Sequence, residues 1–172
     1  MKNQVRRLVF IALFCALVAV GTIVFSIPLP ATQGYINFGD TVIFVAAGFL
    51  GPIGAMLAGA IGSSLADLFL GFAHWAPFTF FIKGLEGLVC GAILTRHQSN
   101  RHDNKGFALQ LFAFVAAGFV MLSGYYLAAG ILFGFGAALA SLVGNVIQAG
   151  VSIIVALIVS RMLMRINVPF GD

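Results

Sequence analysis

The stretch TVIFVAAGFLGPIGAMLAGAIGSSLADLFL, residues 41–70, decides how many helices the chain forms. A helix that crosses a bilayer needs about 20 predominantly apolar residues, and this stretch is about 30 residues long. GPIG stands in its middle, at residues 51–54, and proline suits the first turn of a helix but disfavours its interior. The pattern therefore predicts one helix over residues 39–50 and another over residues 52–70. The first is short for a full span, so it is tilted, locally buried in protein, or begun earlier.

Composition places the whole chain in the membrane. Hydrophobic residues make up 61% of the sequence and charged residues only 8%, with a mean hydropathy of +1.09. Soluble domains carry about 25% charged residues, so this chain lacks the polar surface that faces water. The fold class that follows is an all-α integral membrane protein. Its two cysteines, Cys15 and Cys90, lie in apolar segments without metal-ligand spacing, so we expect no metal, no disulfide framework and no cofactor.

Four further apolar runs complete a single membrane domain over residues 1–172. The segments PLPATQGYINFGD, GFAHWAP and GILFGFG separate them with turn and loop chemistry, and residues 96–106 form a polar loop. The predicted helices are residues 8–27, 78–95, 107–129 and 137–163, beside the two on either side of GPIG.

Basic residues indicate the topology. Eight of the nine Lys and Arg residues fall in three clusters, and Lys83 is the exception. Lys and Arg beside spans stay on the cytoplasmic side, and only an even number of helices puts all three clusters on one side. This bias favours a six-transmembrane-helix bundle with both termini cytoplasmic. The net charge of +4 therefore reflects topology in the lipid bilayer, and we do not expect nucleic acid as a partner. The clusters are Lys2, Arg6 and Arg7; Arg96, Arg101 and Lys105; and Arg161 and Arg165.

The remaining polar residues fall in the outer half of this topology. FIKGLEGLVC, residues 81–90, places Lys83 and Glu86 one turn apart, although a charge near the bilayer centre costs roughly 2.5–3.5 kcal/mol. Ser141, Asn145, Gln148 and Ser152 follow one face of the last helix. Such groups usually point into a solvated cavity, and two outer loops can close it. The candidate substrate-binding residues are Lys83, Glu86, Asp67, Asn145, Gln148, Asn37, Trp75, Tyr35 and His74.

Each candidate also has a structural interpretation. Lys83 and Glu86 can neutralise each other, and Asp67 can lie near headgroup water at a helix end. Asn145 and Gln148 can hydrogen-bond between helices, and Trp75 can be an interfacial anchor. Asp40 is expected to be a helix N-cap after the turn at residues 37–39.

Small residues on the first helix suggest a contact with another protein. Ala12 and Ala16 are four residues apart, and small-xxx-small spacing lets a second helix approach closely. The first helix carries no charge within the membrane, so its alanine face is the best candidate for docking a partner. Glycines of the second, third and fourth helices fit internal packing instead.

Several segments together resemble a known family. ALFCALVAV, NFGDTVIFVAAGFLGPIGAMLAGAIGSSLADLFLG, PFTFFIKGLEGLVCGAI and GNVIQAGVS resemble the substrate-binding S component of energy-coupling factor (ECF) vitamin transporters. The resemblance covers nearly the whole chain and is greatest for the riboflavin-type group with hydroxymethylpyrimidine- and pyridoxine-type members. It implies a six-helix bundle in a bacterial cell membrane that binds a vitamin or precursor from outside.

The resemblance also implies partners. A transmembrane coupling protein would dock on Ala12 and Ala16, and two cytoplasmic ATPases would hydrolyse ATP. The chain itself is expected to be a non-catalytic subunit, and it has no G-x-x-x-x-G-K-[ST] motif. Hydroxymethylpyrimidine or pyridoxine is the favoured substrate; pantothenate, with Lys83 as partner of its carboxylate, and riboflavin are alternatives.

Three other classes fit less well. An intramembrane enzyme would need a base facing Ser63 or Ser64, and no histidine lies on a facing apolar segment. A self-contained secondary transporter commonly shows an internal repeat, which the sequence lacks, but it remains the alternative function. A purely structural membrane subunit would not need aligned polar groups at one depth.

Overall fold

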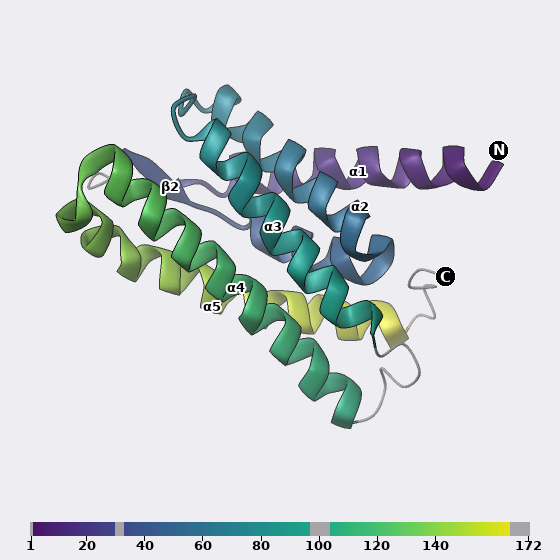
Figure 1. Cartoon of the computed structure of the whole chain (residues 1–172). Coiled ribbons are helices and arrows are strands. Elements are labelled where there is room, and N and C mark those ends of the chain that lie inside the picture. Colours follow the sequence, from purple (N-terminus) through teal and green to yellow (C-terminus); the bar gives the residue numbers. More distant parts are fainter. Residues whose placement is uncertain (1, 30–32, 97–103, 166–172) are drawn as a thin grey trace.

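The structure is a computed structural model, and it describes residues 2–29, 33–96 and 104–165 (Figure 1). The described residues form five helices and one short antiparallel hairpin, and each helix is long and apolar enough to cross a membrane. The all-α membrane class is therefore confirmed. Most of the predicted polar loop, residues 97–103, lies outside the described residues. The elements are α1 (Lys2–Val24), β1 (Ile27–Leu29), β2 (Gly34–Ile36), α2 (Gly39–Phe69), α3 (Ala76–Thr95), α4 (Asn104–Phe133) and α5 (Phe135–Arg165).

Helix α2 is broken where the sequence predicts a boundary between two helices. Gly51 has φ 68° and ψ −169°, and Pro52 follows it inside the helix. Proline forces the residue before it out of the helical region, and glycine adopts a positive φ without steric cost. The count in the described chain is therefore five helices, one of them broken, rather than six separate helices.

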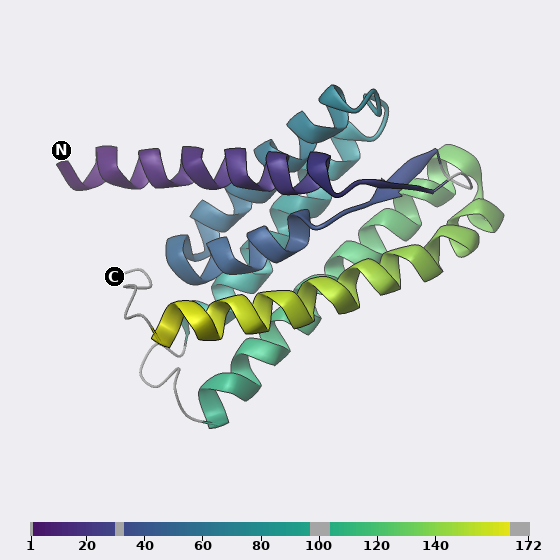
Figure 2. The same cartoon turned by 180° about the vertical axis from the view of Figure 1, so that it is seen from behind.

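The break reverses the direction of α2. A Cβ placed on Gly59 would lie 3.2 Å from Cδ1 of Ile43, whereas sixteen residues of straight helix span about 24 Å. The two halves therefore lie side by side, as Figures 1 and 2 show. Phe44 and Ala47 of the first half are almost fully buried, and Phe44 stacks on Phe114 of α4 at 4.9 Å between ring centroids. Of the three interpretations of this short helix, local burial in protein is the one observed.

Glycine lets α3 pack closely on the second half of α2. A Cβ on Gly91 would lie 2.5 Å from Cα of Pro52, and one on Gly87 would meet the carbonyl oxygen of Ala55. A Cβ atom cannot lie this close to a backbone atom, so any residue larger than glycine would require the backbone to move. The expectation that small residues bring these helices together is confirmed.

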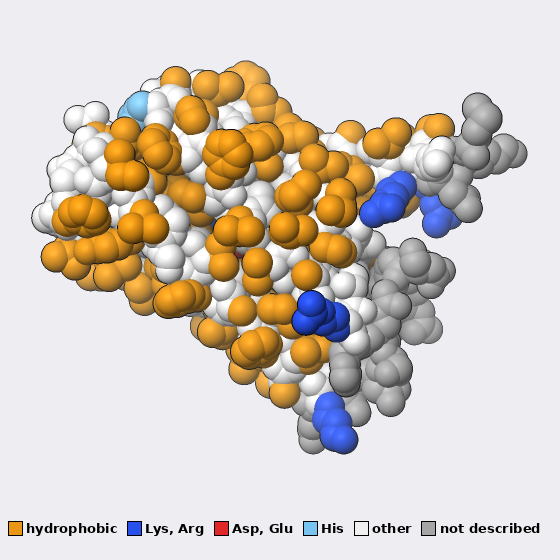
Figure 3. All heavy atoms as spheres, in the orientation of Figure 1, with side chains coloured by type: hydrophobic (Ala, Val, Ile, Leu, Met, Phe, Trp, Pro, Cys, Tyr) orange, Lys and Arg blue, Asp and Glu red, His pale blue; other side chains and the backbone are white. Residues whose placement is uncertain are grey.

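The two ends of the molecule contain different elements. β1 and β2 pair with Ile27 opposite Ile36, in a segment predicted to be a loop. The hairpin lies near the turn between α4 and α5, where Gly134 alone connects the helices with φ 86°. The start of α1 and the end of α5 lie at the opposite end (Figures 1 and 2). Lys and Arg side chains gather at that end of an otherwise apolar surface (Figure 3).

Candidate functional site

A small cavity lies beneath the hairpin, at the end of the molecule away from the basic side chains. Its volume is about 30 Å³, and the space among its lining residues is about 440 Å³ when the open mouth is included. The wall combines the hairpin with α3, α4, α5 and the end of α2. Six of the predicted site residues line it: Tyr35, Asn37, Asp67, Trp75, Asn145 and Gln148.

Asp67 lines the cavity and has one carboxylate oxygen without a hydrogen-bond partner among the described residues. Its side chain is 2% exposed, and the hydroxyl of Tyr35 donates to Oδ1 at 2.6 Å. The other oxygen, Oδ2, is buried and has no hydrogen-bond partner among the described residues. Burial and the neighbouring Asp67 carboxylate both raise the pKa of Tyr35, so its hydroxyl stays protonated and keeps donating. A buried acceptor without a partner is costly, so a donor from a ligand would stabilise this site.

Lys83 and Glu86 do not line the cavity. The Lys83 ammonium contacts Asp40 and donates to Oε2 of Glu86 at 3.0 Å, and the exposed fractions of the three side chains are 2%, 0% and 0%. Lys83 also lies 5.3 Å from the ring centroid of Tyr125, which does line the cavity. The three charges therefore form a buried cluster behind one wall, and Lys83 meets carboxylates of the chain itself.

Asp40 is not a helix N-cap, which corrects the expectation for this residue. The N-cap position is Phe38, which makes no capping hydrogen bond through its side chain, and Oδ1 of Asn37 accepts from the Gly39 N–H at 2.8 Å. Asp40 points inward instead, with one oxygen on Lys83 and the other accepting from Nε2 of Gln148 at 2.8 Å. A cationic partner 43 positions away outweighed the local preference for capping.

Gln148 joins the cavity to this charge cluster. While Nε2 donates to Asp40, Oε1 accepts from the backbone N–H of Asn37 at 2.8 Å. Ser141, Asn145, Gln148 and Ser152 are all at least 92% buried, so the predicted polar stripe of the last helix does face the interior.

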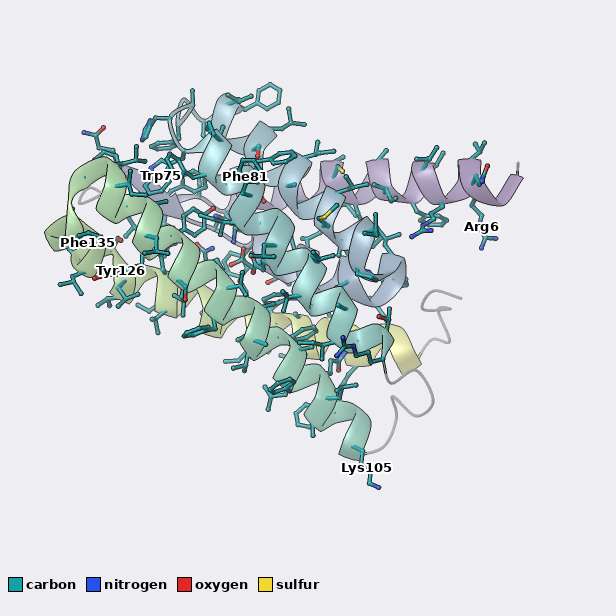
Figure 4. All side chains as sticks on the ribbon, viewed as in Figure 1. Arg6, Trp75, Phe81, Lys105, Tyr126 and Phe135 are labelled. Atoms are coloured by element: carbon teal, nitrogen blue, oxygen red, sulfur yellow. The ribbon has the colours of Figure 1, made fainter. Side chains whose placement is uncertain are left out.

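Aromatic side chains form the side of the cavity near the α2–α3 connection. Trp75 precedes α3 (Figure 4) and is 5% exposed. Its ring packs on that of Tyr125 at 5.7 Å between centroids. His74 is exposed, does not line the cavity, and packs edge-on against Phe133. The structure thus brings Trp75 to the cavity and leaves His74 outside it.

Sequence reasoning missed several residues of the lining. Tyr125 donates from its hydroxyl to Thr79 at 3.2 Å, and both line the cavity. Neither stands out in an apolar helix, although Tyr125 falls at the same depth as the predicted polar residues. Leu29 and Gly34 come from the hairpin, which was not predicted. The residues added by the structure are Leu29, Gly34, Thr79 and Tyr125, while Ser141 joins the lining from the predicted polar stripe.

The proposed docking residues lie on an exposed side of α1. Ala12 and Ala16 are exposed, while Val18 and Cys15 of the same helix pack toward α2. The N-terminal half of α1 stands away from the other helices (Figures 1 and 2). Within the described ranges, no three His, Cys, Asp or Glu side chains gather as a metal site would require.

Comparison with known proteins gives concordant results. Residues 2–165 match the family described as "ECF-type riboflavin transporter, S component". A Pyrococcus woesei protein described as "uncharacterized protein in gap 3′ region" is 41% identical over 138 residues, which cover 80% of this chain and 88% of that protein. The thiamine precursor transporter HmpT of Lactococcus lactis subsp. cremoris is 29% identical over 171 residues, covering 99% of this chain and 95% of HmpT.

A family match over nearly the whole chain, five helices of membrane-spanning length, and a polar cavity within them agree with transport of a vitamin-type compound across a membrane. The resemblance noted from the sequence is confirmed. The chain belongs to the family of ECF-type riboflavin transporter S components.

Proposed function

We propose that this chain is the substrate-binding subunit of an ECF importer that captures a small vitamin or vitamin precursor from outside. The observation that carries the proposal is Asp67, a buried carboxylate with an unpaired oxygen at the wall of a small cavity. A transmembrane coupling protein and two cytoplasmic ATPases would then move the substrate inward. The chain would itself be non-catalytic, as S components generally are, with ATP hydrolysis in its partners.

The orientation that fits this role places the basic end in the cytoplasm. The cavity lies at the end opposite Arg6 and Lys105 (Figures 3 and 4), and basic residues beside spans favour the cytoplasmic side. In this orientation both termini are cytoplasmic and the hairpin faces outward. The two halves of α2 would supply two of six passes, the first of them short and enclosed by protein.

The substrate that fits best is a single heteroaromatic ring that bears hydroxyl or amino donors, with hydroxymethylpyrimidine or pyridoxine favoured. Oδ2 of Asp67 would accept from such a donor, and the amide of Asn145 can pair with a ring nitrogen. Trp75 and Tyr125 provide ring faces for stacking. The similarity to a protein named as a thiamine precursor transporter supports the same class.

The two other vitamins fit less well. Pantothenate would bring a carboxylate to a cavity whose described lining contains Asp67 but no Lys or Arg, because Lys83 is paired behind the wall. Riboflavin has a fused ring system that requires more widening of a cavity of about 30 Å³. A self-contained secondary transporter is the remaining alternative, and independence of transport from any coupling protein would favour it.

Ligand binding to the purified chain tests the proposal. The sequence has a single tryptophan, Trp75, at the cavity, so its fluorescence reports occupancy directly. Mass spectrometry of co-purified small molecules should identify the ligand. Titration without ATP should then give submicromolar dissociation constants for hydroxymethylpyrimidine or pyridoxine and much weaker binding of pantothenate and riboflavin.

Asp67→Asn should weaken that binding by about 10- to 100-fold, because it replaces a charged acceptor by an amide. Glu86→Gln is the matched control, since Glu86 is equally buried but does not line the cavity, and it should change binding little. Failure of every vitamin to bind, or equal binding by the Asp67 variant, would contradict the proposed function.

A further inference from the structure

Gln148 makes one hydrogen bond within the chain at each end of its side-chain amide. Its oxygen accepts from the backbone N–H of Asn37, directly after β2, and its nitrogen donates to Asp40 at the start of α2. Both heavy-atom distances are 2.8 Å, and the side chain is 5% exposed. Gln148 therefore lines the cavity with a side chain whose position is already fixed by two bonds within the chain.

The two partners fix the orientation of the amide. An ionised carboxylate such as Asp40 only accepts, and a backbone N–H such as that of Asn37 only donates, so the reversed amide would oppose like groups at both ends. Asp40 is itself held by Lys83, which is held in turn by Glu86. A continuous chain of contacts thus runs from the hairpin, through α5, to the buried charges of α2 and α3.

We propose that Gln148 is a positioning residue that latches the β2 end of the hairpin closed over the cavity, and that the Asp40–Lys83 pair holds the latch in register. Lifting the β2 end of the hairpin requires the Asn37–Gln148 bond to break, together with the bond from Tyr35 to Asp67, and each opening leaves buried acceptors unpaired. One of the two bonds that control access of a ligand to the cavity therefore involves no group that binds the ligand. The latch is a property of the ligand-free chain; its effect on substrate exchange rests on the proposed function.

Hydrogen exchange of the ligand-free protein in lipid nanodiscs tests the latch. In the unmodified chain, the Asn37 amide should exchange far more slowly than an unstructured amide. Gln148→Leu should speed exchange across residues 34–38 by at least about 10-fold, because it removes the acceptor of Asn37. Gln148→Glu should do the same, because it sets a second carboxylate against Asp40.

Asn145→Leu is the matched control on the same face of α5. Asn145 also lines the cavity and is 8% exposed, but it makes no hydrogen bond to the hairpin among the residues described. It should leave exchange of residues 34–38 unchanged. Exchange in α4 near Phe114 should stay slow in every variant, which shows that the bundle remains folded.

A role-exchanged pair of substitutions separates the latch from a general loss of packing. Combining Gln148→Glu with Asp40→Asn makes position 40 the donor and position 148 the acceptor, while the backbone N–H of Asn37 keeps its acceptor and net charge is conserved. The double variant should recover most of the protection lost in Gln148→Glu alone. Rapid exchange of Asn37 in the unmodified chain would overturn the proposal without any variant, as would unchanged exchange in a folded Gln148→Leu protein.

Stopped-flow binding of hydroxymethylpyrimidine, followed through Trp75, reports the consequence for the substrate. Gln148→Leu should raise both the association and the dissociation rate constants, since the closed hairpin impedes traffic in both directions. Asn145→Leu should raise dissociation alone. Faster hydrogen exchange without binding of any vitamin would sustain the latch and reject the proposed function, whereas an unchanged association rate constant would reject control of access by the latch.

Discussion

Asp40 illustrates how tertiary contacts determine the role of a single residue. Its position at the start of α2 is typical of a capping aspartate, yet its side chain turns inward to Lys83 and Gln148. The side-chain oxygen of Asn37, and not that of Asp40, accepts a hydrogen bond from the Gly39 N–H. The same carboxylate thus compensates the charge of Lys83, which is 2% exposed and could not remain unpaired in the membrane interior.

The buried cluster of Lys83, Asp40 and Glu86 contains one ammonium and two carboxylates. Substitutions of its members should therefore destabilise the protein to different extents. Lys83→Met leaves two buried carboxylates without a cation, and removal of one partner from a buried ion pair costs about 3–5 kcal/mol. Glu86→Gln keeps an acceptor for Lys83 and leaves Asp40 to match its charge, so we expect a loss below about 1.5 kcal/mol.

Thermal unfolding of both variants in the same detergent measures the difference. The Lys83 variant should unfold at a clearly lower temperature than the Glu86 variant. Equal destabilisation would show that Glu86, rather than Asp40, is the essential partner of Lys83.

A few small residues and one proline determine how α2 and α3 pack together. Gly51 and Pro52 turn α2 back on itself, and Gly87 and Gly91 let α3 lie against the returning half. Apolar side chains pack no better against one another than against lipid, so close backbone approach contributes much of the association between membrane helices.

Helix α1 is the element whose exposed face calls for a partner. Ala12→Leu or Ala16→Leu should leave vitamin binding unchanged, because neither residue lines the cavity, and should abolish co-purification with the coupling protein. Leu17→Phe adds bulk on another exposed side of the same helix and should preserve the complex. Persistence of the complex in both alanine variants would place the docking face elsewhere.

The whole molecule has two chemically distinct ends, which makes orientation testable. Gln33 lies in the hairpin connection and Lys105 in the first turn of α4, at the opposite end. With Cys15 and Cys90 replaced by alanine, Gln33→Cys should react with a membrane-impermeant maleimide in intact cells. Lys105→Cys should react only after the cells are permeabilised. The reverse result would overturn the proposed orientation.

Much of the architecture was predictable because it depends on local composition. Apolar runs of membrane length specify helices wherever backbone hydrogen bonds must be satisfied without water. The break before Pro52 and the polar stripe from Ser141 to Ser152 were predictable for the same kind of reason, since each follows from neighbouring residues. The hairpin was not, because Ile27–Leu29 and Gly34–Ile36 are too short for a periodic signal and pair over α5 only in the folded chain.

The sequence by itself determined that this chain enters the membrane, where its helix break falls, and which polar residues share a depth. Only the tertiary structure decided how those residues divide. It placed Asp67 and Asn145 at the cavity, and it paired Lys83 with Glu86 outside the cavity lining. The physical reason is that a buried charge takes the nearest countercharge in space, and for Lys83 that includes Asp40, 43 positions away on another helix.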